Sequence, residues 1–308
     1  MRYWWVNQGK TYNYEVPGGF LWSPKTRADG GRNHFYESMK SVSSGDVVFS
    51  YFETFIRAIG IVQSAAVTAP KPNFRRAGSN WSNEGWYVEV EFVELMNPLK
   101  PKEFIDQIRP LLADKYAPLQ SNGVGKQGTY LTEISRELGE LLVLLAEADL
   151  HSIQSDLSPL PQDENEFELE TDIGARTLEG DLEKLQLTKS RRGQGVFKAN
   201  VRLVEKRCRI TGVTSIRHLR ASHIKPWSVS NNEEKLDGHN GLLLSPHVDH
   251  LFNDGLISFR QSGALLVSRN LNPIVLDQWS IDPHQNVGQF INGQEQYLEY
   301  HRDVIFNP

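Results

Sequence analysis

Cysteine is almost absent from this sequence, which holds one, Cys208, among 308 residues. A single thiol excludes an internal disulfide and any zinc site built from several cysteines. Long apolar runs are also missing: the longest, Leu141–Ala146, is far short of the roughly 18 residues that suggest a membrane span. The N-terminus lacks the apolar core of a signal peptide. We therefore expect a cytoplasmic protein that does not contact a membrane.

Positive charge is not in excess, because 33 Lys and Arg face 38 Asp and Glu, for a net charge of −5. The charges are, however, segregated. Between positions 156 and 183 there are ten acidic residues and one base, whereas between 184 and 225 there are twelve Lys or Arg and one acid. A local basic block is what a nucleic-acid backbone interacts with, although such a run can also be a solvated helix face.

The length is enough for two domains, each with its own core. Residues 1–150 are rich in aromatic residues and glycine, and residues 151–190 combine Ser-Pro-Leu-Pro with the acidic run. The second segment is typical of a linker. We therefore predict a domain over 1–150, an acidic linker over 151–190 and a second domain over 191–308.

Apolar and alternating runs in the first domain predict an antiparallel sheet or small barrel, with strands near 3–6, 46–51, 56–62 and 86–92. Helical spacing predicts helices over Phe104–Leu112 and Leu131–Ala148. Trp4, Trp5 and Trp86 fall within the strand patterns, so we assign them to the core.

In the second domain, apolar residues three to four apart predict a helix over Val196–Lys206. A strand over His218–Ile224 would carry His223 at its end, and Asn240–Leu244 forms a second, buried strand. A short helix over Pro246–Phe252 follows, with proline at a tolerated first-turn position.

This order of strand, histidine, loop, asparagine, strand and helix resembles the HNH family of ββα-metal nucleases. The matching segments are Ala221–Trp227 and Asn240–Phe259, supported by Arg192–Lys198 and Tyr297–Arg302. They are similar to the branch of the family without zinc-knuckle cysteines. The resemblance implies an endonuclease that hydrolyses phosphodiester bonds with the help of a divalent metal ion.

The chemistry explains these residue types. A neutral histidine accepts a proton from water near neutral pH, which suits His223 as the general base. In the family the middle asparagine orients that base, and Asn240 occupies its place. The last metal-binding position falls on Asp249, and Asn253 lies four residues on, on the same helix face. Oxygen ligands favour Mg²⁺ or Mn²⁺, although other divalent ions remain possible. Two positions depart from the family: Asp249 replaces the usual histidine, and Ser222 replaces a frequent ligand.

Other polar residues of this domain have less specific roles. His250 lies about 100° of helix rotation from Asp249 and off the metal face. His239 and His247 contact DNA or nothing, and His218 packs within its strand. The residues expected to contact the DNA backbone are Arg191, Arg192, Lys198 and Lys225.

Segments Tyr3–Asn7, Gly18–Lys25, Asn33–Tyr36, Gly45–Ser50 and Ala58–Val62 resemble the EVE domain, a PUA-like β-barrel. Together the two resemblances imply an EVE–HNH modification-dependent restriction endonuclease, a type IV-like enzyme. Such an enzyme cuts double-stranded DNA that contains 5-methylcytosine or 5-hydroxymethylcytosine. The expected fold is α+β: a PUA-like barrel with flanking helices, linked to a ββα-metal HNH domain.

A domain that inspects one base must flip it out of the stack and hold it between flat side chains, each stacking contact contributing about 1–3 kcal/mol. Trp22 is the leading candidate, because Trp-Ser-Pro breaks a strand and should point the ring outward. The alternative for every tryptophan is a place in the core. The candidate pocket residues are Trp22, Asn33, Phe35, Tyr36, Ser50, Phe55 and Trp81.

Two other functions fit the same residues. One is an HNH nuclease of another specificity, and the other is a non-cleaving protein that binds modified nucleic acid through a degenerate nuclease scaffold. If the chain is a nuclease, one HNH site cuts one strand per engagement, so we expect a homodimer.

Overall fold

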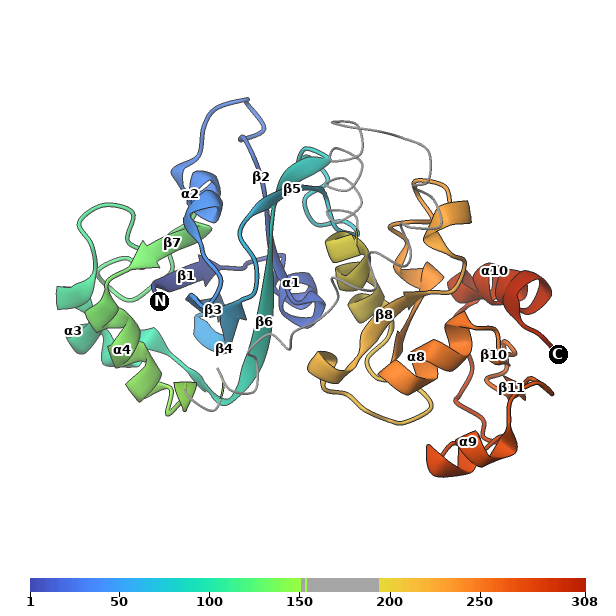
Figure 1. The fold of residues 1–308 in the computed structure, drawn as a ribbon. Helices are drawn as coiled ribbons and strands as arrows, with labels where there is room; N and C mark the ends of the chain where they lie inside the picture. Colours follow the sequence, from blue (N-terminus) through green and yellow to red (C-terminus); the bar gives the residue numbers. More distant parts are fainter. Residues whose placement is uncertain (151–152, 154–193) are drawn as a thin grey trace. The chain divides into compact units, whose positions relative to one another are not determined.

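A computed structural model of the chain describes residues 1–150, 153 and 194–308. The chain divides into two compact units, Met1–Pro161 and Gln162–Pro308 (Figure 1). Except for residue 153, the predicted linker lies outside the described residues, as do Arg191 and Arg192. Within the described ranges, no helix combines the length and the apolarity needed to cross a bilayer.

The first unit is a curved, mixed sheet with short helices at its edges. The strand order is β2-β6-β4-β3-β1-β7, and β5 pairs with β6 on the edge opposite β2. Its elements are β1 (Tyr3–Asn7), α1 (Tyr12–Gly18), β2 (Phe20–Pro24), α2 (His34–Glu37), η1 (Ser38–Ser41), β3 (Val47–Phe52), β4 (Phe55–Val62), β5 (Val67–Pro70), β6 (Glu84–Leu99), η2 (Pro101–Phe104), α3 (Ile105–Ile108), η3 (Arg109–Leu111), β7 (Leu131–Ile134) and α4 (Arg136–Leu145).

One strand pair departs from the predicted antiparallel sheet. β1 runs parallel to β3, with Trp5 opposite Phe49, whereas the other pairs of this sheet are antiparallel. Parallel neighbours need a long crossover, and α1, β2 and α2 supply it between β1 and β3. The predicted α+β class with a half-barrel of strands is confirmed.

Neighbouring tryptophans in β1 serve opposite faces of this sheet. Successive side chains of a strand alternate between faces. Trp5 packs with Phe49 and Leu138 in one buried cluster, and Trp4 packs with Leu21 in another. Both tryptophans are in the core, as predicted. Covering both faces explains why three consecutive residues of the strand, Tyr3–Trp5, are aromatic.

Two helix predictions for this unit are wrong in part. Leu131–Ile134 forms strand β7 against β1, and the helix begins only after Ser135, whose hydroxyl accepts a hydrogen bond from the Leu138 amide at 3.1 Å. The pairing with β1 overrides the helical spacing of the first four residues. The segment Phe104–Leu112 is broken into short turns by Pro110, since proline donates no backbone hydrogen bond.

The second unit builds a two-stranded hairpin, a following helix and a small second hairpin. Its first described element is a helix over residues 194–204. The others are η4 (Ile216–His218), β8 (Arg220–His223), η5 (Trp227–Val229), η6 (Gly238–Asn240), β9 (Gly241–Leu244), α8 (Pro246–Asn253), β10 (Ile257–Phe259), β11 (Leu265–Val267), α9 (Pro273–Gln278), α10 (Asn292–Tyr300) and the π-helical turn η7 (His301–Ile305).

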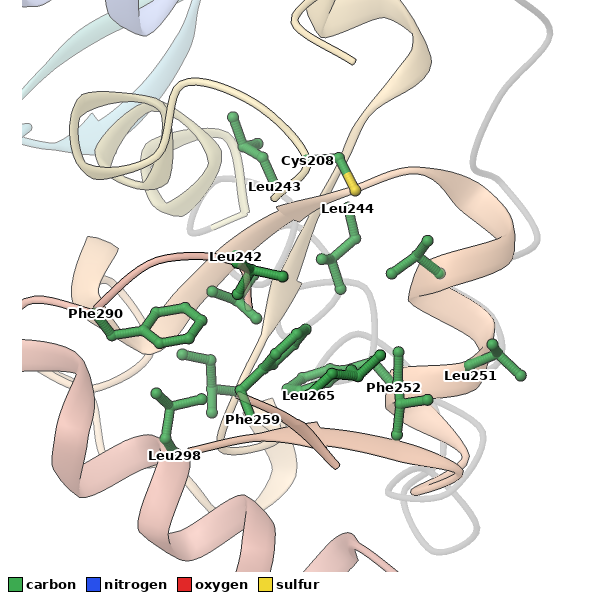
Figure 2. Close-up of a cluster of buried hydrophobic side chains, with 14 of the residues drawn as sticks. Cys208, Leu242, Leu243, Leu244, Leu251, Phe252, Phe259, Leu265, Phe290 and Leu298 are labelled. Carbon is green, nitrogen blue, oxygen red and sulfur yellow. The ribbon is translucent and has the colours of Figure 1, made fainter. Parts of the chain in front are cut away.

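An apolar core fixes α8 against the β8–β9 hairpin. Figure 2 shows Leu242 and Leu244 of β9 in one cluster with Leu251 and Phe252 of α8. Cys208 is a fully buried member of the same cluster and is a free thiol. Because this core immobilises both elements, polar side chains on the facing sides of β8 and α8 keep a fixed spacing.

His301 connects α10 to this core as a neutral ring. It is 1% exposed and stacks on Phe252, with ring centroids 3.8 Å apart. Its Nε2 donates to the Phe252 carbonyl at 3.0 Å, and its Nδ1 accepts from the Ser258 hydroxyl at 2.9 Å. Burial lowers the pKa of His301 from 6.5 to about 4.

This pKa predicts an acid-sensitive fold. The pKa of His301 is near 6.5 in the unfolded chain and about 4 in the folded protein. Between these two pH values the unfolded state therefore binds a proton that the folded state does not bind. Stability from this group is complete above pH 6.5 and is lost as the pH falls to about 4, by about 3 kcal/mol in all. Thermal denaturation between pH 7.5 and 4.5 measures it. His301→Gln should flatten the pH dependence of the melting temperature, and substitution of an exposed histidine, His284→Gln, should not. Parallel curves for the wild type and both variants would show that His301 is not the source of the pH dependence.

Candidate nuclease centre

Three oxygen-bearing side chains meet where β8 faces α8. Ser222 Oγ donates to Asn253 Oδ1 at 3.1 Å, and Asn253 Nδ2 donates to Asp249 Oδ1 at 3.1 Å. Ser222 and Asp249 are buried, whereas Asn253 is exposed. The predicted pair Asp249 and Asn253 is therefore brought together, and Ser222 joins it from the facing strand.

The positively charged side chain of Arg220 lies next to this cluster. Arg220 precedes Ser222 by two residues, so both side chains leave the same face of β8. The Arg220 Nη1 lies 3.5 Å from Asp249 Oδ2. Burial raises the pKa of Asp249, and the hydrogen bond from Ser222 and the nearby Arg220 charge act in the opposite direction.

The donor set fits a hard divalent ion. Asp249 supplies one carboxylate, and Ser222 and Asn253 supply neutral oxygens within hydrogen-bond distance of one another. Mg²⁺ is commonly held by one or two carboxylates, with water and substrate phosphate filling the remaining positions. Across the described residues, no group of three or more His, Cys, Asp and Glu could hold a metal ion.

His223 is the last residue of β8, directly after Ser222 in sequence, and its side chain leaves the opposite face of the strand. Its ring stacks on Phe197, with centroids 3.5 Å apart, and meets the edge of Trp227 at 5.6 Å. His223 Nε2 lies 3.3 Å from the Lys235 carbonyl oxygen. Since a carbonyl only accepts, Nε2 carries the proton and Nδ1 is the basic nitrogen of the neutral ring. Burial lowers the pKa of His223 to about 4, which keeps the ring neutral.

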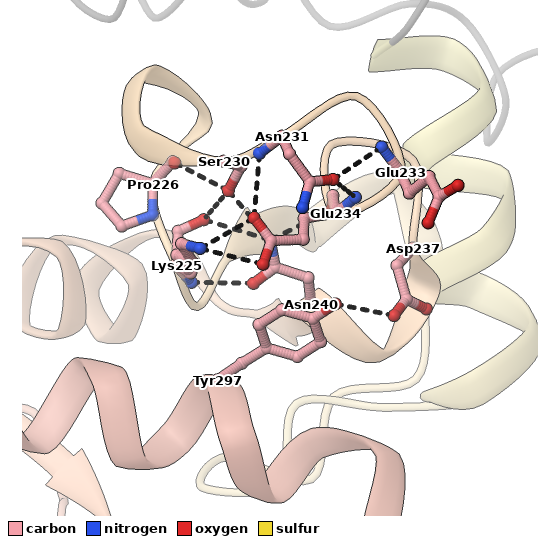
Figure 3. A network of polar contacts seen from close by, with 9 residues as sticks. All are labelled: Lys225, Pro226, Ser230, Asn231, Glu233, Glu234, Asp237, Asn240 and Tyr297. Carbon is pink, nitrogen blue, oxygen red and sulfur yellow. Dashed lines mark hydrogen bonds and ion pairs between the residues drawn. The ribbon is translucent and has the colours of Figure 1, made fainter.

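Asn240 organises the loop that follows His223. Its Oδ1 accepts from the Lys225 amide at 2.8 Å, and its Nδ2 donates to the carbonyls of Lys225 and Glu234, both at 3.1 Å. Figure 3 shows this amide enclosed by the loop, with Ser230 beside it. The Asn240 side chain faces this loop, so its effect on His223 passes through the backbone. Orientation is indirect: Asn240 holds the loop, and the loop places the Lys235 carbonyl against the ring.

The predicted DNA-backbone residues are only partly available for phosphate. Lys225 pairs with Glu234 at 2.7 Å, an ion pair that closes the same loop (Figure 3). This pairing neutralises the charge that was expected to face DNA. Lys198 is half-buried on the helix over 194–204.

The remaining histidines have local partners. His239 Nδ1 lies 2.8 Å from Asp237 Oδ1, and the exposed His250 lies 3.4 Å from Asp254 Oδ2. His247 meets the ring of Trp279 at 5.4 Å. These contacts give no sign of a second ligand set around Asp249.

In the first unit, Trp22 is buried rather than directed outward. It is 1% exposed, because Phe74 and Trp81 of the loop between β5 and β6 cover it. The Trp22 and Trp81 rings are nearly parallel, with centroids 6.0 Å apart and an interplanar angle of 28°. We call Trp22, Phe74 and Trp81 the aromatic cluster. Among the described residues, the buried Trp22 Nε1 has no hydrogen-bond partner.

The other predicted pocket residues separate into different places. Asn33 caps α2 by accepting from the Phe35 amide at 2.9 Å, and Phe35 meets Tyr116 edge to face at 5.8 Å. Tyr36 is half-buried on α2, and burial raises its pKa. Phe55 lies at the β3–β4 turn, beneath the Arg57 guanidinium.

Ser50 belongs to a buried polar network that the sequence did not suggest. It donates to Gln8, which in turn donates to Glu15 at 2.9 Å. Glu15 also accepts from the Trp22 amide at 3.0 Å and from the Tyr130 hydroxyl. Burial raises the pKa of Glu15, although these donors act against the rise. The network fixes the backbone of Trp22. The only sequence signal was an acid in an otherwise aromatic and apolar stretch.

The C-terminal unit thus has a β-hairpin whose first strand ends in a histidine, followed by a helix whose oxygen donors face that strand. Residues 208–260 match the model of the HNH endonuclease family, so the C-terminal region contains an HNH domain. A comparison with curated proteins gives no match.

Solved structures similar to the chain correspond to its N-terminal part. They include Rpa0253 from Rhodopseudomonas palustris, at 19% identity, over 48% of this chain and 94% of that chain, with a TM-score of 0.31. Human THYN1 in complex with 5-methylcytosine-containing DNA matches at 14% identity, over 48% of this chain and 99% of that chain, with a TM-score of 0.30. Atu2648 from Agrobacterium tumefaciens matches at 14% identity, over 48% of this chain and 92% of that chain, also with a TM-score of 0.30. Likeness at this level does not identify a ligand for this chain.

Proposed function

We propose that this protein is a modification-dependent DNA endonuclease. The C-terminal unit would hydrolyse phosphodiester bonds, and the N-terminal unit would recognise 5-methylcytosine or 5-hydroxymethylcytosine in double-stranded DNA. The observation that carries the proposal is the convergence of Ser222, Asp249 and Asn253 inside the segment that matches the HNH endonuclease model, with His223 next to Ser222 in sequence at the end of β8.

Each residue of the centre has a definite part in hydrolysis. His223 Nδ1 would take the proton of the attacking water, with the ring held by the Lys235 carbonyl. Asp249, Asn253 and Ser222 would hold Mg²⁺ or Mn²⁺. The ion, when bound, supplies charge stabilisation to the phosphate and the leaving oxygen. Since one such centre cuts one strand, a double-strand break requires two copies of the chain or two visits.

The aromatic cluster supports the reader half of the proposal. A base sandwiched between two rings needs about 7 Å, because each stacking contact takes about 3.5 Å. The Trp22 and Trp81 centroids are 6.0 Å apart at an interplanar angle of 28°, so Trp81 would have to move outward before a base could enter between the rings. Trp81 is half-buried on its loop, so of the two rings it is the one with room to move. Glu15, which accepts a hydrogen bond from the Trp22 amide, would keep the Trp22 backbone in place during this movement.

The test is digestion of one DNA sequence in plain, 5-methylcytosine, 5-hydroxymethylcytosine and glucosylated forms, with Mg²⁺ or Mn²⁺. We expect cutting of modified but not of plain DNA. Equal cutting of all four would refute the reader half, and no cutting with any ion would refute the nuclease half.

Trp81→Ala should remove the preference for modified DNA. Loss of one stacking contact corresponds to about 5–150-fold weaker binding of the modified duplex, with little change for the plain one. Fluorescence anisotropy on matched oligonucleotides measures both affinities. Trp81→Phe keeps an aromatic face and should retain most of the preference. An equal loss on both duplexes would assign Trp81 to the fold rather than to base recognition.

A further inference from the structure

Arg220 occupies the same carboxylate that a divalent ion would need. Its Nη1 lies 3.5 Å from Asp249 Oδ2, while Asp249 Oδ1 accepts from Asn253. Asp249 is 4% exposed, so its charge has little water around it. In this structure the guanidinium is therefore the counter-ion of the carboxylate.

Two cations cannot share this carboxylate without mutual repulsion. A divalent ion on Asp249 would remove the attraction that keeps Arg220 in place and would repel its guanidinium. Arg220 is one-third exposed at its side chain, so it has room to turn toward solvent and any bound DNA. A guanidinium also matches phosphate oxygens with two parallel donors, which a lysine ammonium does not.

We propose, on the basis of the nuclease function above, that Arg220 is a catalytic residue that exchanges partners. In the absence of the ion, the Arg220 guanidinium neutralises the Asp249 carboxylate. With the ion bound, its guanidinium binds a non-bridging oxygen of the scissile phosphate. The side chain thus competes with the metal for Asp249 and assists the metal at the phosphate.

The exchange predicts two effects of opposite sign for Arg220→Gln. Competition between two ligands for one group is reciprocal, and coupling of this kind is typically about 5–150-fold. We expect Arg220→Gln to bind Mn²⁺ about 10-fold more tightly in the absence of DNA, by isothermal titration calorimetry of the full chain. We expect the same variant to cut modified DNA about 100-fold more slowly, since loss of one preorganised donor to the transition state has this size.

Two further variants make the result specific. Arg220→Lys keeps the charge and loses the paired donors, so its Mn²⁺ affinity should stay near that of the wild type while cutting is slowed. Arg269→Gln, on an exposed arginine of the same unit, should change neither quantity.

Unchanged or weaker Mn²⁺ binding by Arg220→Gln would overturn the exchange, because a purely structural role predicts no gain in metal affinity. Faster or unchanged cutting would overturn the phosphate contact. If the wild-type chain cuts no DNA at all, the proposed function fails, and the Mn²⁺ titration still decides whether Arg220 and the ion compete for Asp249.

Discussion

Replacing His223 by alanine should lower the rate of DNA cleavage by about 10²–10⁴-fold, the range typical of a lost general base. The ring is the one imidazole placed at the end of β8 beside Ser222, and the Lys235 carbonyl at 3.3 Å fixes which nitrogen is basic. His223 faces Phe197 and Trp227 rather than the exterior, so DNA affinity should stay within about twofold while cutting is lost. Single-turnover cleavage and anisotropy titration measure the two quantities separately.

His250→Ala is the matched control for this substitution. His250 lies on α8 next to Asp249 in sequence, but it is exposed and paired with Asp254. Its loss should leave cleavage unchanged. Because alanine at 223 also leaves a gap beside Phe197, the melting temperature must be compared, and His223→Gln provides a second, bulkier variant. Full activity in both folded variants would mean that another group is the base.

Replacing Asp249 by asparagine should weaken Mn²⁺ binding by more than about 100-fold, beyond the effect of losing an outer-shell partner. Asp249 is the one carboxylate in contact with Asn253 and Arg220 in this cluster, and the asparagine keeps its shape while removing its charge. Cleavage should fall with metal affinity and recover in part at high Mn²⁺ concentration. Calorimetry without DNA and cleavage rates across a Mn²⁺ series test this.

Asp254→Asn serves as the control, because Asp254 is an exposed acid at the C-terminal cap of the same helix. It should alter neither Mn²⁺ affinity nor cleavage. Unchanged Mn²⁺ binding in Asp249→Asn would contradict the assignment of this carboxylate as a ligand. The expected directions for Asp249→Asn and Arg220→Gln are opposite, so together they separate a ligand from its competitor.

The sequence was most informative where one element sets the spacing of its own side chains. Asp249 and Asn253 are one helical turn apart, and the structure does bring them together. Alternation along β1 likewise placed Trp4 and Trp5 in the core. The same alternation puts Arg220 and Ser222 on one face of β8.

The sequence was least informative where distant segments decide the outcome. Trp22 is buried because Phe74 and Trp81 fold over it from a later loop, and no local pattern specifies that cover. Leu131–Ile134 has helical spacing, but it pairs with β1. The stacking of Phe197 on His223 joins a helix to a strand across a turn region. Tertiary contacts of this kind override local propensity.

The burial of the Asn240 side chain also affects the chemical stability of the protein. Asparagine followed by glycine is the pair most open to spontaneous deamidation, in which the next backbone nitrogen attacks the side-chain amide. Here the amide is fully buried and held by Lys225 and Glu234, and Gly241 is committed to pairing with His223 in β9. The attack therefore requires the loop to open. An aspartate formed at this position could not donate to the carbonyls of Lys225 and Glu234. Each opening of the loop therefore permits an irreversible reaction that removes the hydrogen bonds holding the loop in place.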